Sequence, residues 1–314
     1  ASGTPAPSNI FQLWPSMYAI GSVLGDEYHP FEQKYGYQVS VGPVMKWKPR
    51  KDAEALIRKR IDLVSYFIKR EDAISLPARN YVNVEFDLQP EHRKFYDKIK
   101  KDFIAATQGY DADGDLLQGK AKVEYEVAMR IKLLQIISGF VTIEDIQGRD
   151  HRVALQWSSK MDELDKLVQT HLESDQDNNL IIWCTFRWEV ETIYEKYKDM
   201  ASYIYGGMSD KARNAMLDKW LNTKECRIMV AIPASAKFGH TWLKANASIY
   251  FSATENFEDH AQSRDRNYRR GQTRVVTEYK LISRGTIERN IWYAISNKHT
   301  LDSFLKDYGM RENS

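Results

Sequence analysis

The sequence predicts an α/β fold with a parallel sheet, and two observations support this prediction. Short runs of consecutive apolar residues, such as 180–184 and 247–251, are typical of strands that are buried on both faces. Segments with helical periodicity separate these runs throughout the second half of the chain. Strands that alternate with helices form parallel sheets covered by helices on both faces, so we expect one such lobe here.

The elements of this lobe can be placed in chain order. The expected strands are residues 180–184, 227–232, 247–251 and 275–282, and a helix is expected near residues 188–197. Ser209 follows a Gly206-Gly207 turn and can cap a helix whose apolar residues are Ala212, Met216, Leu217 and Trp220. Thr286 opens a last helix that carries Ile287, Ile291, Trp292 and Ile295.

The first half has a different pattern. Residues 50–72, 90–106 and 120–138 show charged helical periodicity, and residues 140–157 indicate a hairpin with Gly148 at its turn. Residues 108–119 are rich in Gly and Asp and indicate a solvated loop. We therefore expect helical protrusions and a linker that lead into the α/β lobe.

Composition limits the class of protein. A chain of 314 residues is long enough for two domains, and its net charge of only +2 excludes a strongly basic nucleic-acid binder, although basic clusters occur at residues 46–51 and 264–274. Cys184 and Cys226 lie in apolar runs, which indicates reduced, buried thiols and an intracellular protein. No apolar stretch is long enough to cross a membrane, and the seven histidines show no metal-ligand spacing.

Residues 262–272 contain two arginines three apart, Arg266 and Arg269, in a polar segment that we expect to be helical up to Gly271. Residues i and i+3 share one face of a helix, so both guanidiniums could reach one target. Guanidinium forks are suited to phosphate because they are permanently charged and bind in a bidentate manner. An isolated pair of this spacing would more often be a solvated basic helix, so the flanking residues decide.

With Gln262 and Gln272 included, the run resembles the last motif of Swi/Snf-type superfamily 2 helicases and translocases, Q-x-x-x-R-x-x-R-x-G-Q. The resemblance implies a second RecA-like lobe in which Arg266 and Arg269 are arginine fingers on the γ-phosphate of ATP. It further implies that Gln262 and Gly239 belong to the ATP site. The nucleotide and Mg²⁺ would be bound mainly by another lobe.

Two further segments resemble motifs of the same family. Residues 234–241 follow an expected strand and resemble the fifth motif, in which Ser235, Lys237 and Thr241 would contact the nucleic-acid backbone. The family usually has more glycines here and often Asn at the position of Thr241. Residues 180–186 resemble the fourth motif, which implies nucleic-acid contacts by Thr185 and Phe186, although alone this run is simply a core strand.

The start of the chain adds an independent match. Residues 2–5 with Leu13-Trp14 resemble the third motif, in which Thr4 would couple the γ-phosphate to the nucleic-acid site. Weaker matches follow in the family's order: Phe31 with Tyr35, 67–70, Leu76-Pro77, 133–136, Gly139-Phe140 and Ser159-Lys160. The resemblance therefore spans nearly the whole chain.

Three other motifs are rejected on chemical grounds. Gly114-x4-Gly119-Lys120 has the spacing of a phosphate-binding loop, but Ala121 replaces the Mg²⁺-binding hydroxyl and acidic residues surround it. Residues 26–29 look like a DExH box but follow the third motif. The aspartates at 111, 113 and 115 suggest a calcium loop, yet they lack its glycine and glutamate.

The sequence thus predicts the C-terminal half of a nucleic-acid-dependent ATPase. Residues 1–78 would be the trailing part of a first RecA-like lobe, 79–156 a helical linker with a hairpin, and 157–314 the second lobe. The expected partners are DNA, bound as a duplex through its backbone, and a P-loop lobe in cis or in trans, and a monomer without membrane contact is expected. Lacking that lobe, the chain should not hydrolyse ATP alone.

Two alternatives remain open. The chain could be a non-catalytic DNA-binding module, or a natural half that pairs with a separate P-loop subunit. The resemblance implies a cytoplasmic protein in a bacterium or phage and a nuclear one in a eukaryote. Unwinding, remodelling and simple translocation are not distinguished by the sequence, and RNA is less expected than DNA.

Overall fold

The computed structural model describes residues 10–21, 23–41, 44–61, 64, 75–107, 120–145, 147–157, 159–237 and 241–296. Thr4, Gly239 and the loop 108–119 lie outside these residues. The chain divides into two compact units, the first formed by residues 1–74 and 107–126 and the second by 75–106 and 127–314. Within the described residues, no helix is long and apolar enough to cross a membrane.

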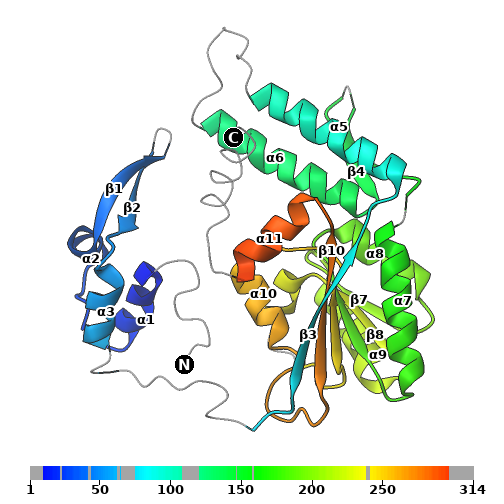
Figure 1. Ribbon diagram of the computed structural model, residues 1–314. Coiled ribbons are helices and arrows are strands. Elements are labelled where there is room, and N and C mark those ends of the chain that lie inside the picture. Colours follow the sequence, from blue (N-terminus) through cyan, green and yellow to red (C-terminus); the bar gives the residue numbers. More distant parts are fainter. Residues whose placement is uncertain are drawn as a thin grey trace. The chain divides into compact units, whose positions relative to one another are not determined.

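The first unit has a small core of its own. The 3₁₀ helix η1 (Ile10–Gln12) and the helices α1 (Leu13–Ala19), α2 (Tyr28–Tyr35) and α3 (Ala53–Ile61) bury apolar side chains such as Phe11, Phe31 and Ile57. Strands β1 (Gly36–Val41) and β2 (Val44–Pro49) form an antiparallel hairpin, an element that the sequence did not indicate. A helix was expected over residues 50–72. The described part of this range contains α3, which covers residues 53–61 (Figure 1).

The second unit is built on a six-stranded sheet in which every adjacent pair is parallel. Its strand order is β3-β10-β9-β6-β8-β7. The strands are β3 (Arg79–Phe86), β6 (Leu180–Trp183), β7 (Ala201–Ile204), β8 (Ile228–Ala231), β9 (Ala247–Tyr250) and β10 (Val276–Ser283). The predicted α/β fold is confirmed, and all four expected strands are present. Strands β3 and β7 were not expected.

The local sequence explains the central strands. Every residue of β6, β8 and β9 is buried, as continuous apolar runs require when helices cover both faces. The covering helices are α7 (Ser159–Ser174), α8 (Arg187–Lys196), α9 (Asp210–Asn222), α10 (Phe257–Arg264) and α11 (Ile287–Ser296). Figure 1 shows α10 and α11 on one side of the sheet and α7 on the other. Ser209 caps α9 as predicted, because its side chain accepts a hydrogen bond from the Ala212 amide. Both cysteines are buried and free.

Helices α5 (Pro90–Thr107) and α6 (Lys120–Ile137) lie where charged helical periodicity indicated them. They are joined across the core by a 2.7 Å contact between His92 Nε2 and the Ile136 carbonyl oxygen. Strands β4 (Phe140–Glu144) and β5 (Asp150–Ala154) form the expected antiparallel hairpin, and Gly148 has a φ of 75° at its turn. Glycine suits this position because other residues rarely adopt positive φ.

The helical prediction for the arginine run is wrong. Helix α10 ends at Arg264, so Arg266 and Arg269 lie in the turns of residues 265–271, which we call the arginine loop. Contacts from elsewhere in the lobe replace helical hydrogen bonds, since the Arg266 carbonyl accepts from the Trp242 amide at 2.9 Å. Gly271 ends the loop with a φ of 101°. The two arginines therefore do not share the face of a helix.

Candidate functional site

The end of β6 presents Thr185 and Phe186, both half-buried. Their amides donate to Glu189 Oε2 at 2.9 and 3.0 Å, and the Thr185 amide also donates to Ser252 Oγ. The Thr185 hydroxyl donates to the Ala253 carbonyl at 3.1 Å. Glu189 is fully buried, so one carboxylate fixes the turn that follows β6. A glutamate three residues after the N-cap of a helix is the sequence signal that could have indicated this role.

The segment after β8 is the short helix η2 (Pro233–Lys237), which packs against α10. Ser235 is buried and its hydroxyl donates to the Ile232 carbonyl at 2.7 Å, so this side chain is committed inside the lobe. Lys237 ends the helix, and its side chain lies outside the described part of the structure. Thr241 is exposed. Three residues of the fifth motif were expected to contact nucleic acid. Among their described side chains, that of Thr241 is exposed to solvent and that of Ser235 is not.

Arg266 and Arg269 differ in burial. Arg266 is only 9% exposed, whereas Arg269 is exposed. Burial lowers the pKa of Arg266, and the positive charge of Arg269 lowers it further, so the two guanidiniums lie within electrostatic reach of each other. An arginine keeps its charge despite such a shift because its ordinary pKa is above 12. The loop therefore presents two neighbouring positive charges, one partly desolvated and one in solvent.

Gln272 is the residue that holds the arginine loop in place. Its amide nitrogen donates to three carbonyl oxygens, those of Leu243, Ala245 and Asn267, at 3.0–3.1 Å. Its amide oxygen accepts from the amides of the next two residues. One buried side chain thus joins both ends of the loop to the segment before β9. The sequence marked Gln272 as part of a motif but gave no indication of this role.

Gln262 lies on α10, half-buried, and its amide donates to Glu258 Oε1 at 2.9 Å. Helix α10 begins beside the end of β9, and the arginine loop begins where it ends. Helix η2 packs against α10. The arginine loop follows α10 directly in the chain, and its Arg266 carbonyl accepts a hydrogen bond from the Trp242 amide.

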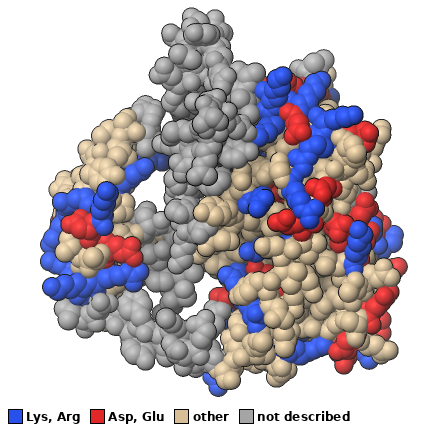
Figure 2. Space-filling view, in the orientation of Figure 1, with Lys and Arg blue, Asp and Glu red and all other residues tan. Residues whose placement is uncertain are grey.

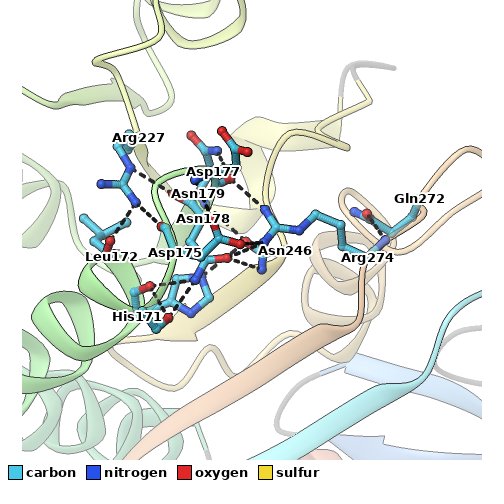
Figure 3. A network of polar contacts seen from close by, with 11 residues as sticks. His171, Leu172, Asp175, Asp177, Asn178, Asn179, Arg227, Asn246, Gln272 and Arg274 are labelled. Atoms are coloured by element: carbon cyan, nitrogen blue, oxygen red, sulfur yellow. Dashed lines mark hydrogen bonds and ion pairs between the residues drawn. The ribbon is translucent and has the colours of Figure 1, made fainter.

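Thr185 and Phe186 lie where the strands end. The other edge of the sheet, where the strands begin, carries a polar network (Figure 3). Asn246 Nδ2 donates to Asn178 Oδ1 at 2.8 Å, and Arg274 donates to that same oxygen and to Asp175. Arg227 donates to the carbonyls of Leu172, Asp175 and Asn178. These residues precede β6, β8, β9 and β10, so the network ties the starts of four strands together just beyond Gln272. The network adjoins the arginine loop, because the amide of Arg274 donates a hydrogen bond to the side chain of Gln272.

The second unit has a cavity and a charged surface that bear on phosphate binding. The cavity, of about 400 Å³ at the ends of β3 and β10, is lined by four carboxylates and two cations, those of Glu85, Asp87, Asp162, Glu163, Lys166 and Arg284. Because Lys166 and Arg284 pair with these acids, the lining has a net negative charge that does not favour phosphate. Figure 2 shows Lys and Arg over α5 and α6 interspersed with acidic residues. Within the described ranges, no three His, Cys, Asp or Glu side chains form a metal-binding group. The arginine loop is the described feature best suited to a phosphate.

Comparison with known proteins agrees with this description. Residues 159–271 match the family described as helicase conserved C-terminal domain. The DNA excision repair protein CSB of Oryza sativa is 24% identical over 98% of this chain and 26% of its own length. An uncharacterized ATP-dependent helicase of Mycoplasma genitalium is 22% identical over 96% of this chain and 27% of its own length. The chain therefore spans about a quarter of these relatives.

Solved structures show the same fold. The C-terminal part of the Fun30 ATPase domain superposes with a TM-score of 0.55 at 18% identity, covering 69% of this chain and 88% of that one. The Sulfolobus solfataricus SWI2/SNF2 ATPase core in complex with dsDNA gives 0.54 at 22% identity, covering 94% and 59%.

The sheet, its covering helices and the matched region define a RecA-like lobe of the helicase C-terminal type. Residues 159–271 carry the helicase conserved C-terminal domain, and the relatives and solved structures support the resemblance to the C-terminal part of Swi/Snf-type superfamily 2 helicases that the motifs predicted.

Proposed function

We propose that this chain supplies the arginine fingers and DNA-backbone contacts of a nucleic-acid-dependent ATPase that translocates on DNA. The observation that supports the proposal most is the arginine loop. Arg269 is exposed, Arg266 lies within electrostatic reach of it, and Gln272 fixes the loop that carries both. A fixed pair of guanidiniums is suited to charge that develops on a transferred phosphoryl group.

ATP would be bound mainly by a P-loop lobe, and bound Mg²⁺ would neutralise negative charge on its phosphates. Arg269 would reach the γ-phosphate because its side chain is in solvent. Arg266, partly desolvated, would act as the second positive charge beside it. Arginine fingers contribute between about 10³- and 10⁵-fold to phosphoryl transfer in well-studied enzymes.

DNA would be bound at the segments that follow β6 and β8. Thr241 offers an exposed hydroxyl, while Ser235 would act by holding the backbone of η2, since its own hydroxyl is committed to Ile232. The S. solfataricus protein with a similar fold was solved with double-stranded DNA, which supports a duplex as the ligand. Contacts to the backbone would make binding independent of sequence and sensitive to salt.

The test combines this chain with a lobe that bears the P-loop and the acidic Mg²⁺ site, fused or added in trans. DNA-stimulated ATP hydrolysis should appear, and Arg269→Ala should lower its rate by about 10³-fold or more. Arg149→Ala is the matched control, because Arg149 pairs with Asp145 in the exposed turn of the β4–β5 hairpin. The control should keep the full rate.

Three other outcomes have definite meanings. An unchanged rate in Arg269→Ala would contradict the arginine-finger role. Salt-sensitive DNA binding with no hydrolysis in any combination would favour a non-catalytic module. Hydrolysis that appears only when the lobe is a separate polypeptide would favour a natural half that pairs in trans.

A further inference from the structure

The arginine loop is joined to the segment of chain by which the second unit begins. The Tyr268 hydroxyl donates to the Pro77 carbonyl oxygen at 2.8 Å. Residues 75–78 precede β3, and the chain N-terminal to them leads to the first unit. The Val276 amide donates a hydrogen bond to the carbonyl oxygen of the next residue, Ala78, at 3.1 Å. One of the connections between the units, at residues 75–78, thus enters the lobe beside the arginine loop.

Arg79 reinforces this contact. Its guanidinium lies over the Tyr268 ring, with the central carbon 4.8 Å from the ring centroid. The same guanidinium donates to Glu278 Oε2 at 2.8 Å and to the Arg264 carbonyl at 3.2 Å. Arg264 in turn donates to Glu278 and to the Tyr81 hydroxyl. One buried carboxylate therefore holds two guanidiniums, one from β3 and one from the end of α10.

The burial of this cluster makes it resistant to rearrangement. The side chains of Arg79 and Glu278 are 9% and 1% exposed, so separating them would leave a charge without compensation inside the protein. A cation over an aromatic ring is also strengthened when water is excluded. Residues 77–79 and the arginine loop should accordingly move together rather than separately.

We propose that Tyr268 is a positioning residue that latches the arginine loop to residues 75–78, so that a displacement of this connection repositions Arg266 and Arg269. The latch rests on the proposed function, because it couples movement between the units to phosphoryl transfer. Tyr268 itself would touch neither ATP nor DNA. Its ring packs under the guanidinium of Arg79, and its hydroxyl donates a hydrogen bond to the Pro77 carbonyl oxygen.

Tyr268→Phe tests the latch, because it removes the hydroxyl and keeps the ring over Arg79. Hydrogen–deuterium exchange of the chain should rise about 3- to 10-fold in residues 75–79 and 265–271 together, while β6 and β9 stay protected. In the complemented ATPase, kcat should fall about tenfold while KM for ATP and the melting temperature stay unchanged, as expected when a catalytic group is misplaced.

Tyr197→Phe is the matched control, since it removes a tyrosine hydroxyl that hydrogen-bonds Asp165 on α7. It should leave the exchange of both segments and kcat unchanged. Arg79→Lys keeps the charge beside Glu278 but loses the planar fork, so it should raise exchange in the same two segments. A double change with Tyr268→Phe should then cost less than the sum of the single effects.

The latch is overturned if Tyr268→Phe raises exchange in only one of the two segments, or if kcat stays constant while Arg269→Ala abolishes hydrolysis. It is likewise overturned if kcat falls only in proportion to a loss of folded protein. A failure of the proposed function looks different. Arg269→Ala would then leave hydrolysis intact, while the paired exchange of the two segments would still show whether the latch exists.

Discussion

A single side-chain amide determines where the arginine loop lies. Gln272 is buried, and the two N–H groups of its amide are shared among three carbonyl oxygens while its amide oxygen accepts from two backbone amides. No other uncharged side chain offers two donors and an acceptor at that length. The arginines are named by the motif, but their position depends on this neighbour.

Gln272→Glu should destabilise the chain by about 3 kcal/mol at neutral pH, because a carboxylate would face three carbonyl oxygens without a proton to donate. Urea unfolding measures the loss. Gln147→Glu makes the same change in an exposed turn and should shift the free energy of unfolding by less than about 0.5 kcal/mol. Equal effects in the two variants would show that the hydrogen bonds of Gln272 contribute nothing to the stability of the chain.

His260 gives the chain a pH dependence. It is 3% exposed on α10, between the rings of Tyr250 and Trp292. Burial lowers its pKa to about 2, with further lowering by the charges of Lys280, Arg264 and Arg79. The unfolded chain, with a pKa near 6.5, therefore binds a proton first as the pH falls. Stability should be complete above about pH 6.5 and decline below it.

His260→Gln should reduce this decline by about 2 kcal/mol between pH 7 and pH 5, since glutamine does not titrate. The measurement is the free energy of unfolding in urea at the two pH values. His92 and His171, whose pKa values are also lowered by burial, should keep a residual slope in the variant. A slope identical to that of the natural chain would contradict the assignment to His260.

At the scale of elements, the lobe is closed by contacts between the beginnings of its helices. Lys160 at the start of α7 pairs with Glu288 at the start of α11, and both side chains are almost completely buried. The second oxygen of Glu288 accepts the Ser283 amide at the end of β10. Burial raises the pKa of Glu288, and the charge of Lys160 opposes that change. The pair fixes both helices to the edge at which the strands end.

Lys160→Met should cost about 3–5 kcal/mol at neutral pH, because it leaves the Glu288 carboxylate buried without its cation. Adding Glu288→Gln should restore a large part of the loss, since no buried charge then remains. Thermal and urea unfolding of the two variants decide between these outcomes. If the double variant is as unstable as the sum of the single ones, the pair acts as two independent packing residues.

At the scale of the whole molecule, the sequence predicted what depends on local pattern. The buried runs of β6, β8 and β9, the cap at Ser209 and the hairpin around Gly148 are all set by neighbouring residues. Strand β3 could not be recognised, because most of its residues are polar or exposed and its pairing partner β10 is remote in sequence. The family resemblance pointed to the lobe but not to its full sheet.

The motif indicated Arg266 and Arg269 as site residues, and this assignment stays a prediction. The geometry expected for them was wrong, because the helix that would have carried both ends at Arg264. Hydrogen bonds from Trp242 and Gln272 bend the chain there, and such tertiary contacts leave no periodic signal. The roles of Ser235 and Thr185 changed for the same reason, since their hydroxyls bond carbonyls inside the lobe.

The position of β3 has a consequence for how the protein is made. This strand forms one edge of the sheet and pairs along its length with β10. In this pairing Arg79, the first residue of β3, is the register partner of Val276. During synthesis β3 emerges before β6, β7, β8 and β9, and its partner β10 emerges after all of them. Contacts so distant in sequence form slowly. The nascent chain must therefore keep β3 without its partner while these strands are made, and the lobe can complete its sheet only after β10 has emerged.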